Sequence, residues 1–236
     1  MRLRFCGLAA LAALGVSLAF AVDARADVTP PASFPASGIL LQARVVARAR
    51  PNPSAARVLT LYQFRLKDAK RQIVLALAKA TGTDGRLWYK LSLPMRPNGT
   101  RGWVPASTVD VTPVHKRIVV HRGLRRLVVL RNGVRIFRTN VAVGMPSAPT
   151  PLGHNFYVTL RFRPSDSFLG AFAFETSAYS SLTEWPGGGV VGIHGTTLPD
   201  LLGQAVSHGC VRVSNSAALR LKELVPLGTP VDIVRR

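Results

Sequence analysis

The sequence predicts a mainly β protein, in which a small β-barrel is followed by a second β-rich domain with one or two helices. Short apolar runs separated by Pro, Gly and Asn occupy residues 39–111. Strand-like runs flank an Asn-Gly pair near residue 132, and one amphipathic helical pattern lies near residue 220. The chain has 236 residues, of which 47% are hydrophobic and 18% are charged, so it can bury a core despite its high charge.

The first 26 residues have the three parts of a secretory signal peptide. Arg2 and Arg4 form a charged start, residues 6–22 form an apolar run, and residues 24–26 are Ala-Arg-Ala, which is a small-x-small cleavage signal. We therefore expect export to the cell envelope and removal of residues 1–26. An uncleaved membrane anchor is the alternative, because the apolar run approaches the ~20 residues that span a bilayer.

The expected mature chain begins with a linker and a small barrel. Residues 27–38 contain three prolines among small residues, which predicts an extended linker. Residues 39–112 are expected to form the β-barrel. The segments 45–54, 87–90 and 101–105 resemble parts of the bacterial Src-homology-3-like (SH3-like) modules of exported cell-envelope enzymes. The resemblance implies binding of peptides or wall components; alternatively, the tryptophans of these segments are core residues that bind nothing.

A second domain is expected over residues 116–236. Residues 126–130 and 134–137 are rich in apolar and β-branched side chains, and Asn132-Gly133 separates the two runs. Asn-Gly between such runs favours a type I′ hairpin turn, because both central residues of that turn need a positive φ. The composition therefore changes here to that of a new sheet.

One amphipathic helix is predicted near the C-terminus. Ala217, Leu221 and Leu224 recur at helical spacing, and residues 214–216 offer side-chain caps before them. A proline and a glycine follow and end the helix. Residues 231–234 are then expected to form a closing strand.

The chain is strongly basic, with 31 Lys and Arg against 11 Asp and Glu and a formal net charge of +20. Such a charge attracts anionic partners over long distances. Because we expect export, no nucleic acid is predicted as a partner. Peptidoglycan carboxylates and other anionic cell-envelope polymers are the expected partners, and no obligate protein partner is inferred.

The cysteine content directs attention to one thiol. The chain has two cysteines, and Cys6 lies within the expected signal peptide, so the exported chain keeps only Cys210. A single cysteine outside the cytoplasm cannot close an internal disulfide bond, and it is either a free reactive thiol or an intermolecular partner.

Cys210 lies in a group of residues that suits acyl transfer through a thioester. An imidazole that takes the thiol proton makes the sulfur a nucleophile, and His194 and His208 are both candidates. Gly195 and Gly209 allow the backbone to approach a substrate and to direct N–H groups at a developing oxyanion. Two other interpretations remain open at this point. These side chains could be structural, or the two histidines and Cys210 could bind zinc, although they lack the paired spacing of structural zinc sites.

The same residues carry a resemblance to a known family. Residues 193–196, Ile-His-Gly-Thr, and residues 207–212, Ser-His-Gly-Cys-Val-Arg, resemble the signature of the L,D-transpeptidase catalytic domain of the YkuD type. Upstream, residues 142–144 and 150–153 are similar to that family's Val-Gly and Thr-Pro-x-Gly segments. The resemblance covers residues 116–236. It implies a β-sandwich with a helix beside the catalytic cleft, acyl exchange in peptidoglycan, and no metal or other cofactor.

The resemblance also implies two catalytic roles. Cys210 would attack the carbonyl of the third residue of a tetrapeptide stem, the terminal D-Ala would leave, and an amine would then resolve the thioester. His194 would activate the thiol and pass its proton to the leaving amine.

Further roles follow for the residues that surround this pair. The carbonyl of Gly195 would orient the histidine ring, and His208 and Gly209 would shape the cleft. The amides of Gly209 and of the cysteine after it would donate to the oxyanion. Ser207 would support the loop, and Arg212 would hold the substrate or the loop.

The sequence therefore predicts an exported peptidoglycan L,D-transpeptidase that cross-links or remodels the cell wall and so contributes to cell-wall organization and cell shape. Two alternatives remain. In an L,D-carboxypeptidase, water rather than an amine would resolve the thioester. A non-catalytic wall-binding protein would use the barrel and the basic surface, but it would have no need of His194, Gly209 and Cys210.

Overall fold

The computed structural model describes residues 31, 33–184 and 187–236 of the chain. The expected signal peptide, residues 1–26, lies outside the described residues, as do residues 27–30 and 32 of the expected linker, residues 27–38. None of the helices that are described is long and apolar enough to cross a membrane.

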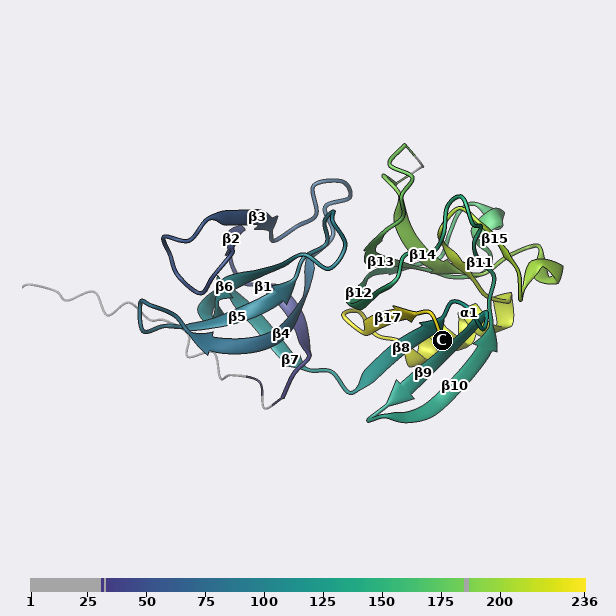
Figure 1. Cartoon of the computed structure of the whole chain (residues 1–236). Coiled ribbons are helices and arrows are strands. Elements are labelled where there is room, and N and C mark those ends of the chain that lie inside the picture. The colour runs from purple at the N-terminus through teal and green to yellow at the C-terminus, as the bar shows by residue number, and fades with distance from the viewer. Residues whose placement is uncertain (1–30, 32, 185–186) are drawn as a thin grey trace, which may run out of the picture.

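Two β-rich modules lie side by side in the molecule (Figure 1). We call residues 36–113 the N-terminal module and residues 116–234 the C-terminal module. The described part of the chain has one α-helix and three single-turn 3-10 helices, and strands form the rest of its regular structure. The prediction of a mainly β protein is therefore confirmed.

The N-terminal module is a seven-stranded antiparallel sheet in the order β3-β2-β6-β5-β4-β1-β7, which curls around its own core (Figure 1). The elements are β1 (Ala36–Leu40), β2 (Arg44–Arg48), β3 (Arg57–Tyr62), β4 (Ile73–Thr81), β5 (Leu87–Ser92), β6 (Arg101–Pro105), the 3-10 turn η1 (Ala106–Thr108) and β7 (Val109–Pro113).

Alternating side chains build the core of this module. In β2, Val45 and Ala47 are buried while their neighbours are more exposed, as the two-residue period of a strand requires. Trp88 is 1% exposed, and its Nε1 donates a hydrogen bond of 3.0 Å to Oδ1 of Asp84. Trp103 is only partly buried. Trp88 is therefore a core residue, and Trp103 lies nearer the surface.

The C-terminal module is a mixed eight-stranded sheet in the order β10-β9-β8-β17-β12-β13-β14-β16, with a separate β11-β15 pair. Its elements are β8 (Lys116–His121), β9 (Arg126–Arg131), β10 (Val134–Asn140), β11 (Val143–Gly144), β12 (Gly153–Phe162), η2 (Ser167–Leu169), β13 (Ala173–Tyr179), β14 (Val190–His194), η3 (Pro199–Leu201), β15 (Ala205–Ser207), β16 (Val211–Arg212), α1 (Asn215–Leu224) and β17 (Pro230–Val234).

Two local predictions are confirmed in this module. Asn132 and Gly133 have φ values of 49° and 80° at the turn between β9 and β10, as a type I′ turn requires. The helix α1 begins after Ser214, whose side chain accepts a hydrogen bond of 3.1 Å from the amide of Ala217. This bond satisfies one of the amides that a helix N-terminus leaves unpaired.

The sheet of the C-terminal module has a core face and an outer face. One apolar cluster joins strands from both halves of the sheet with α1, so the sheet folds around a single core. On the outer face, Tyr157 of β12 is fully buried against Ile73 and Leu75 of the N-terminal module. Its hydroxyl donates a hydrogen bond of 3.2 Å to the carbonyl of Ile73. The N-terminal module therefore covers part of this outer face.

Candidate active site

Two parallel strands, β14 and β16, bring the predicted catalytic residues together. Ile193 pairs with Val211, and both side chains are buried in the core. Because side chains alternate along a strand, Gly192 and His194 face away from that core. Cys210 directly precedes Val211, and its sulfur lies over Gly192 on this outer face. The thiol and the imidazole are therefore neighbours on one face of the sheet.

Gly192 forms the floor between the two groups. Its amide donates a hydrogen bond of 3.3 Å to Sγ of Cys210. A Cβ atom at this position would lie 3.7 Å from that sulfur and 3.7 Å from Cδ2 of His194. A reacting carbonyl above Gly192 could therefore reach both groups. We assigned Gly192 no role from the sequence, although a glycine two positions before a catalytic histidine in a strand shares its face.

A backbone carbonyl fixes the orientation of the His194 ring. Nδ1 lies 2.6 Å from the oxygen of Gly195, and His194 is 3% exposed. A carbonyl can only accept, so Nδ1 carries the proton and Nε2 of the neutral ring keeps a lone pair. The expected contact between the Gly195 carbonyl and the ring is therefore present. A Cβ on Gly195 would collide with Oδ1 of Asn215, so glycine is required here for space.

Burial shifts both reacting groups toward their neutral forms. Burial lowers the pKa of His194, the Gly195 carbonyl opposes this shift, and the positive charge of Arg212 reinforces it. Burial raises the pKa of the Cys210 thiol, although the Gly192 amide and Arg212 act in the opposite direction. At neutral pH the resting pair is therefore an uncharged thiol beside an uncharged imidazole.

The loop before β16 is held by its own hydrogen bonds. Ser207 donates from Oγ to the carbonyl of Cys210 at 2.6 Å, and the amide of Gly209 donates to the same Oγ at 3.2 Å. Gly209 has a φ of 117°, and a Cβ there would lie 2.7 Å from Cβ of Ser180. His208 lies half-buried between these residues. Hydrogen bonds from and to Ser207 thus join Ser207, Gly209 and Cys210 within this loop.

Arg212 is a buried cation beside this pair. It is 7% exposed, and its guanidinium carbon lies 4.9 Å from the ring centroid of Phe168. Its Nε has no hydrogen-bond partner among the described residues, and no acidic side chain within them forms an ion pair with it. The Phe168 ring also lies 6.3 Å from the His194 ring, between centroids. Phe168 lies in η2, within the long connection before β13.

Within residues 31, 33–184 and 187–236, no three His, Cys, Asp or Glu side chains lie close enough together to hold a metal ion. Cys210 is the free cysteine of this part of the chain.

The fold and the site define a β-rich protein with a thiol and an imidazole over one glycine of a sheet. The family model of the L,D-transpeptidase catalytic domain, YkuD, matches residues 115–233. The chain belongs to this family, and the resemblance inferred from the sequence is confirmed.

Two relatives from Bacillus agree with this assignment. The chain is 37% identical over 162 residues to the YkuD protein of Bacillus licheniformis, and the aligned region covers 66% of this chain and 92% of that protein. It is 36% identical over 124 residues to the YkuD protein of Bacillus subtilis, covering 52% of this chain and 67% of that protein. A solved L,D-transpeptidase from Stackebrandtia nassauensis is 22% identical with a TM-score of 0.39, covering 51% of this chain. The present chain spans only 56% of that protein's length.

Proposed function

We propose that this protein is an exported peptidoglycan L,D-transpeptidase that uses Cys210 to transfer an acyl group through a thioester. The observation that carries the proposal is the meeting of Cys210 and His194 over Gly192 on one sheet face. Membership of the L,D-transpeptidase family supplies the reaction and the substrate class. The substrate is a tetrapeptide stem of peptidoglycan, and the product is a cross-linked or remodelled cell wall.

In the first step the thiol becomes a nucleophile only as it attacks. Nε2 of His194 takes the thiol proton while Sγ of Cys210 bonds to the carbonyl carbon of the third stem residue. The carbonyl oxygen gains the negative charge. Because the amide of Gly209 already donates to Ser207, the amide of Cys210 is the better placed of the two expected donors for that charge.

In the second step the imidazolium returns its proton. The bond from the carbonyl carbon to the D-Ala nitrogen breaks, His194 protonates that nitrogen, and D-Ala leaves. The third stem residue stays on Cys210 as a thioester. An acceptor amine then attacks the thioester and passes a proton to His194. The thiolate that departs takes the proton back, so the enzyme is restored without a cofactor.

Arg212 binds a carboxylate of the stem in this proposal. A buried guanidinium without an acidic partner is costly, and a substrate anion would satisfy it. The same charge favours the thiolate over the thiol and the neutral imidazole over the imidazolium, which helps both groups into their attacking forms. Arg212 therefore serves both binding and activation.

Mass spectrometry of the protein mixed with a purified tetrapeptide stem tests the proposal. We expect an acyl adduct on the peptide that contains Cys210, release of D-Ala, and stem dimers when an amine-bearing stem is present. Tripeptide without dimers would assign the protein as an L,D-carboxypeptidase instead. Protein with Cys210→Ala should form neither adduct nor products, and turnover by that variant would refute the nucleophile.

Export is a separate part of the proposal. The expected signal peptide and the strongly basic composition support an extracytoplasmic protein that associates with anionic wall polymers. The mass of the protein recovered from an envelope fraction tests this, because cleavage after residue 26 leaves a defined shorter chain. Full-length protein in the membrane would point to an uncleaved anchor, and wall association that ignores added salt would contradict an electrostatic attachment.

A further inference from the structure

A cavity of about 330 Å³ lies at the junction of the two modules, beside the catalytic face. We propose that this cavity binds the peptide stem, with Lys67 of the N-terminal module holding one of the stem's free carboxylates. The N-terminal module would then be part of the substrate site rather than a separate wall-binding unit. The inference rests on the proposed function, because it takes the stem as the substrate.

The cavity and the thiol share one face of the sheet. Val190 of β14 lines the cavity, and its carbonyl lies 4.0 Å from Sγ of Cys210. Glu175 of β13 also lines it and pairs in register with Gly192, the floor of the catalytic site. Side chains of directly paired residues start about 5 Å apart on the same face of a sheet. A stem that reaches Cys210 can therefore extend into this cavity.

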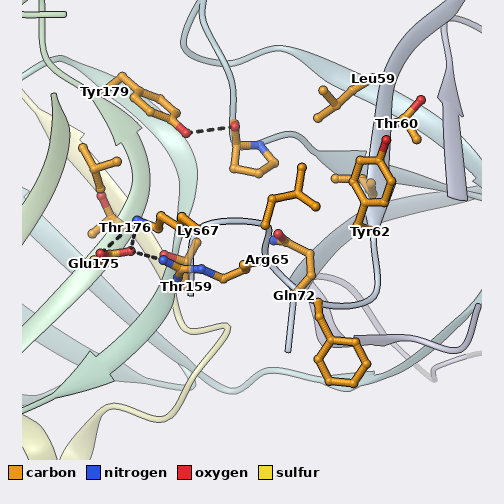
Figure 2. Close-up of a pocket in the computed structure, with 15 residues that line it drawn as sticks. Leu59, Thr60, Tyr62, Arg65, Lys67, Gln72, Thr159, Glu175, Thr176 and Tyr179 are labelled. Carbon is orange, nitrogen blue, oxygen red and sulfur yellow. Dashed lines mark hydrogen bonds and ion pairs between the residues drawn. The ribbon is translucent and has the colours of Figure 1, made fainter. Parts of the chain in front are cut away.

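The opposite wall is formed by β3 and by the loop that follows it. We call residues 63–72, between β3 and β4, the cationic loop, because it has four basic residues against one acidic residue. Figure 2 shows Arg65 and Lys67 of this loop reaching across the junction to Glu175 on the sheet of the C-terminal module. The loop thus brings positive charge from one module to the catalytic face of the other.

The two cations of this loop have different environments. Arg65 has a side chain 7% exposed and contacts two carboxylates through Nη2, which lies 2.7 Å from Glu175 and 3.0 Å from Asp68. Its role is to join the modules. The side chain of Lys67 is 49% exposed, and its ammonium lies 3.0 and 3.1 Å from the two carboxylate oxygens of Glu175.

Lys67 has a donor left for a ligand. An ammonium has three N–H groups, and the contacts to Glu175 use two of them. Glu175 therefore holds the ammonium in place at the cavity and leaves one of its N–H groups available. A stem carboxylate can accept from the third N–H, and the net positive charge of the cationic loop favours that anion.

The remaining walls suit a peptide with small side chains. Leu59, Tyr62 and Leu66 give apolar surface on the N-terminal side, and Tyr62 and Leu66 are 40% and 84% exposed. Thr159 and Thr176 give hydroxyl groups on the C-terminal side (Figure 2). An extended stem has methyl and methylene groups, backbone amides and carboxylates, and each finds a matching surface here.

The experiment compares two stems that differ in one charge. One stem keeps all its carboxylates, and the other has a primary amide in place of one carboxylate outside the departing residue. We expect wild-type protein to prefer the free acid. In Lys67→Gln the ratio of kcat/KM for acid and amide stems should fall about twofold to fivefold, as for one partly exposed charge pair. The control is Lys79→Gln, an exposed lysine of β4 that does not line the cavity and should keep the wild-type ratio.

A second measurement separates this inference from the proposed function. Calorimetric binding of both stems to Cys210→Ala protein, with and without Lys67→Gln, needs no turnover. A preference for the acid that depends on Lys67 supports the inference even if no stem is turned over, in which case the proposed function alone fails. The inference would be overturned if wild-type protein bound and turned over both stems equally. It would also be overturned if Lys67→Gln left the preference unchanged, and in both cases the proposed function would stand.

Discussion

The catalytic face and the junction between the modules are held by different kinds of contact. At the catalytic face the partners of the reacting groups are backbone atoms, namely the Gly192 amide on the thiol and the Gly195 carbonyl on the His194 ring. Both contacts involve uncharged backbone groups, and the one to His194 is short and buried. Burial, rather than these contacts, favours the neutral thiol and the neutral imidazole in the resting site.

The junction uses charged and amide side chains instead. Arg65 and Lys67 bind Glu175, and Asn98 exchanges two hydrogen bonds with the backbone of Tyr179, at 2.7 and 3.0 Å. Several of these groups are partly exposed, so water and salt weaken them. This difference indicates that the reaction and the attachment of one module to the other depend on separate sets of contacts. Changes at the catalytic face should slow the chemical step with little effect on stability, and changes at the junction should affect stability or stem preference but not the chemical step.

The largest effect is expected for His194→Ala. Loss of the base that takes the thiol proton should slow acylation of Cys210 by about two to four orders of magnitude. Rates come from the appearance of the acyl adduct by mass spectrometry. The matched control is His154→Ala, which removes a histidine whose side chain is 66% exposed, and it should behave as wild type. Near-wild-type acylation by the His194 variant would remove it from the mechanism.

Gly192→Ala should slow the reaction without harming the fold. The added methyl would meet the sulfur and the imidazole at 3.7 Å, which is ordinary contact, but it would fill the space that a substrate carbonyl needs. We expect kcat/KM to fall about tenfold to a hundredfold, as for a misplaced substrate. The melting temperature should stay level or rise, because glycine within a strand stabilises the fold less than alanine does. A fall in melting temperature together with full activity would contradict this account of the floor.

The pH dependence should show the burial of the reacting groups. Activity needs neutral His194, whose pKa is lowered below 6.5, so kcat/KM should stay level down to that pH and fall about tenfold per unit below the lowered pKa. The free energy of unfolding should also fall as the pH falls. The unfolded histidine protonates first as pH falls, so the stability that neutral His194 gives is lost below pH 6.5. If kcat/KM already falls to half its maximum above pH 7 as the pH is lowered, the ring is not buried as described.

The smallest effect is expected at the junction. Asn98→Ala leaves the amide and carbonyl of Tyr179 without their side-chain partner, which should cost about 1–3 kcal/mol of unfolding free energy. The acidic limb of the pH profile should not move, because Asn98 touches neither reacting group. Asn140→Ala, at an exposed position of the edge strand β10, is the control and should leave stability unchanged. A changed pH profile in the Asn98 variant would mean that the two regions are coupled.

Local features of the fold could be predicted from the sequence. The Asn132-Gly133 turn and the helix capped by Ser214 follow from the preferences of a few neighbouring residues, and the structure has both. Cys210 and His194 were proposed in the same way, because each lies in a short motif, and their catalytic roles stay predictions. The assignment of the first module as SH3-like stays a prediction, as do the expected signal peptide and the domain boundaries.

The features that the sequence did not indicate depend on residues far apart in the chain. Glu175 lies more than a hundred residues from Arg65 and Lys67, and neither side has a pattern that names the other. Phe168 reaches His194 only because a long connection folds back over the sheet. Such contacts are set by how two sheets pack, and no local preference encodes that packing.

The backbone nature of the catalytic contacts has an evolutionary consequence. A substitution replaces a side chain, but it leaves the amide of residue 192 and the carbonyl of residue 195 in place. A ligand that bound only these groups and the sulfur would present few positions at which a single mutation could weaken it. Variation that alters ligand preference should therefore accumulate around the cavity at the junction, where side chains rather than the main chain make the contacts.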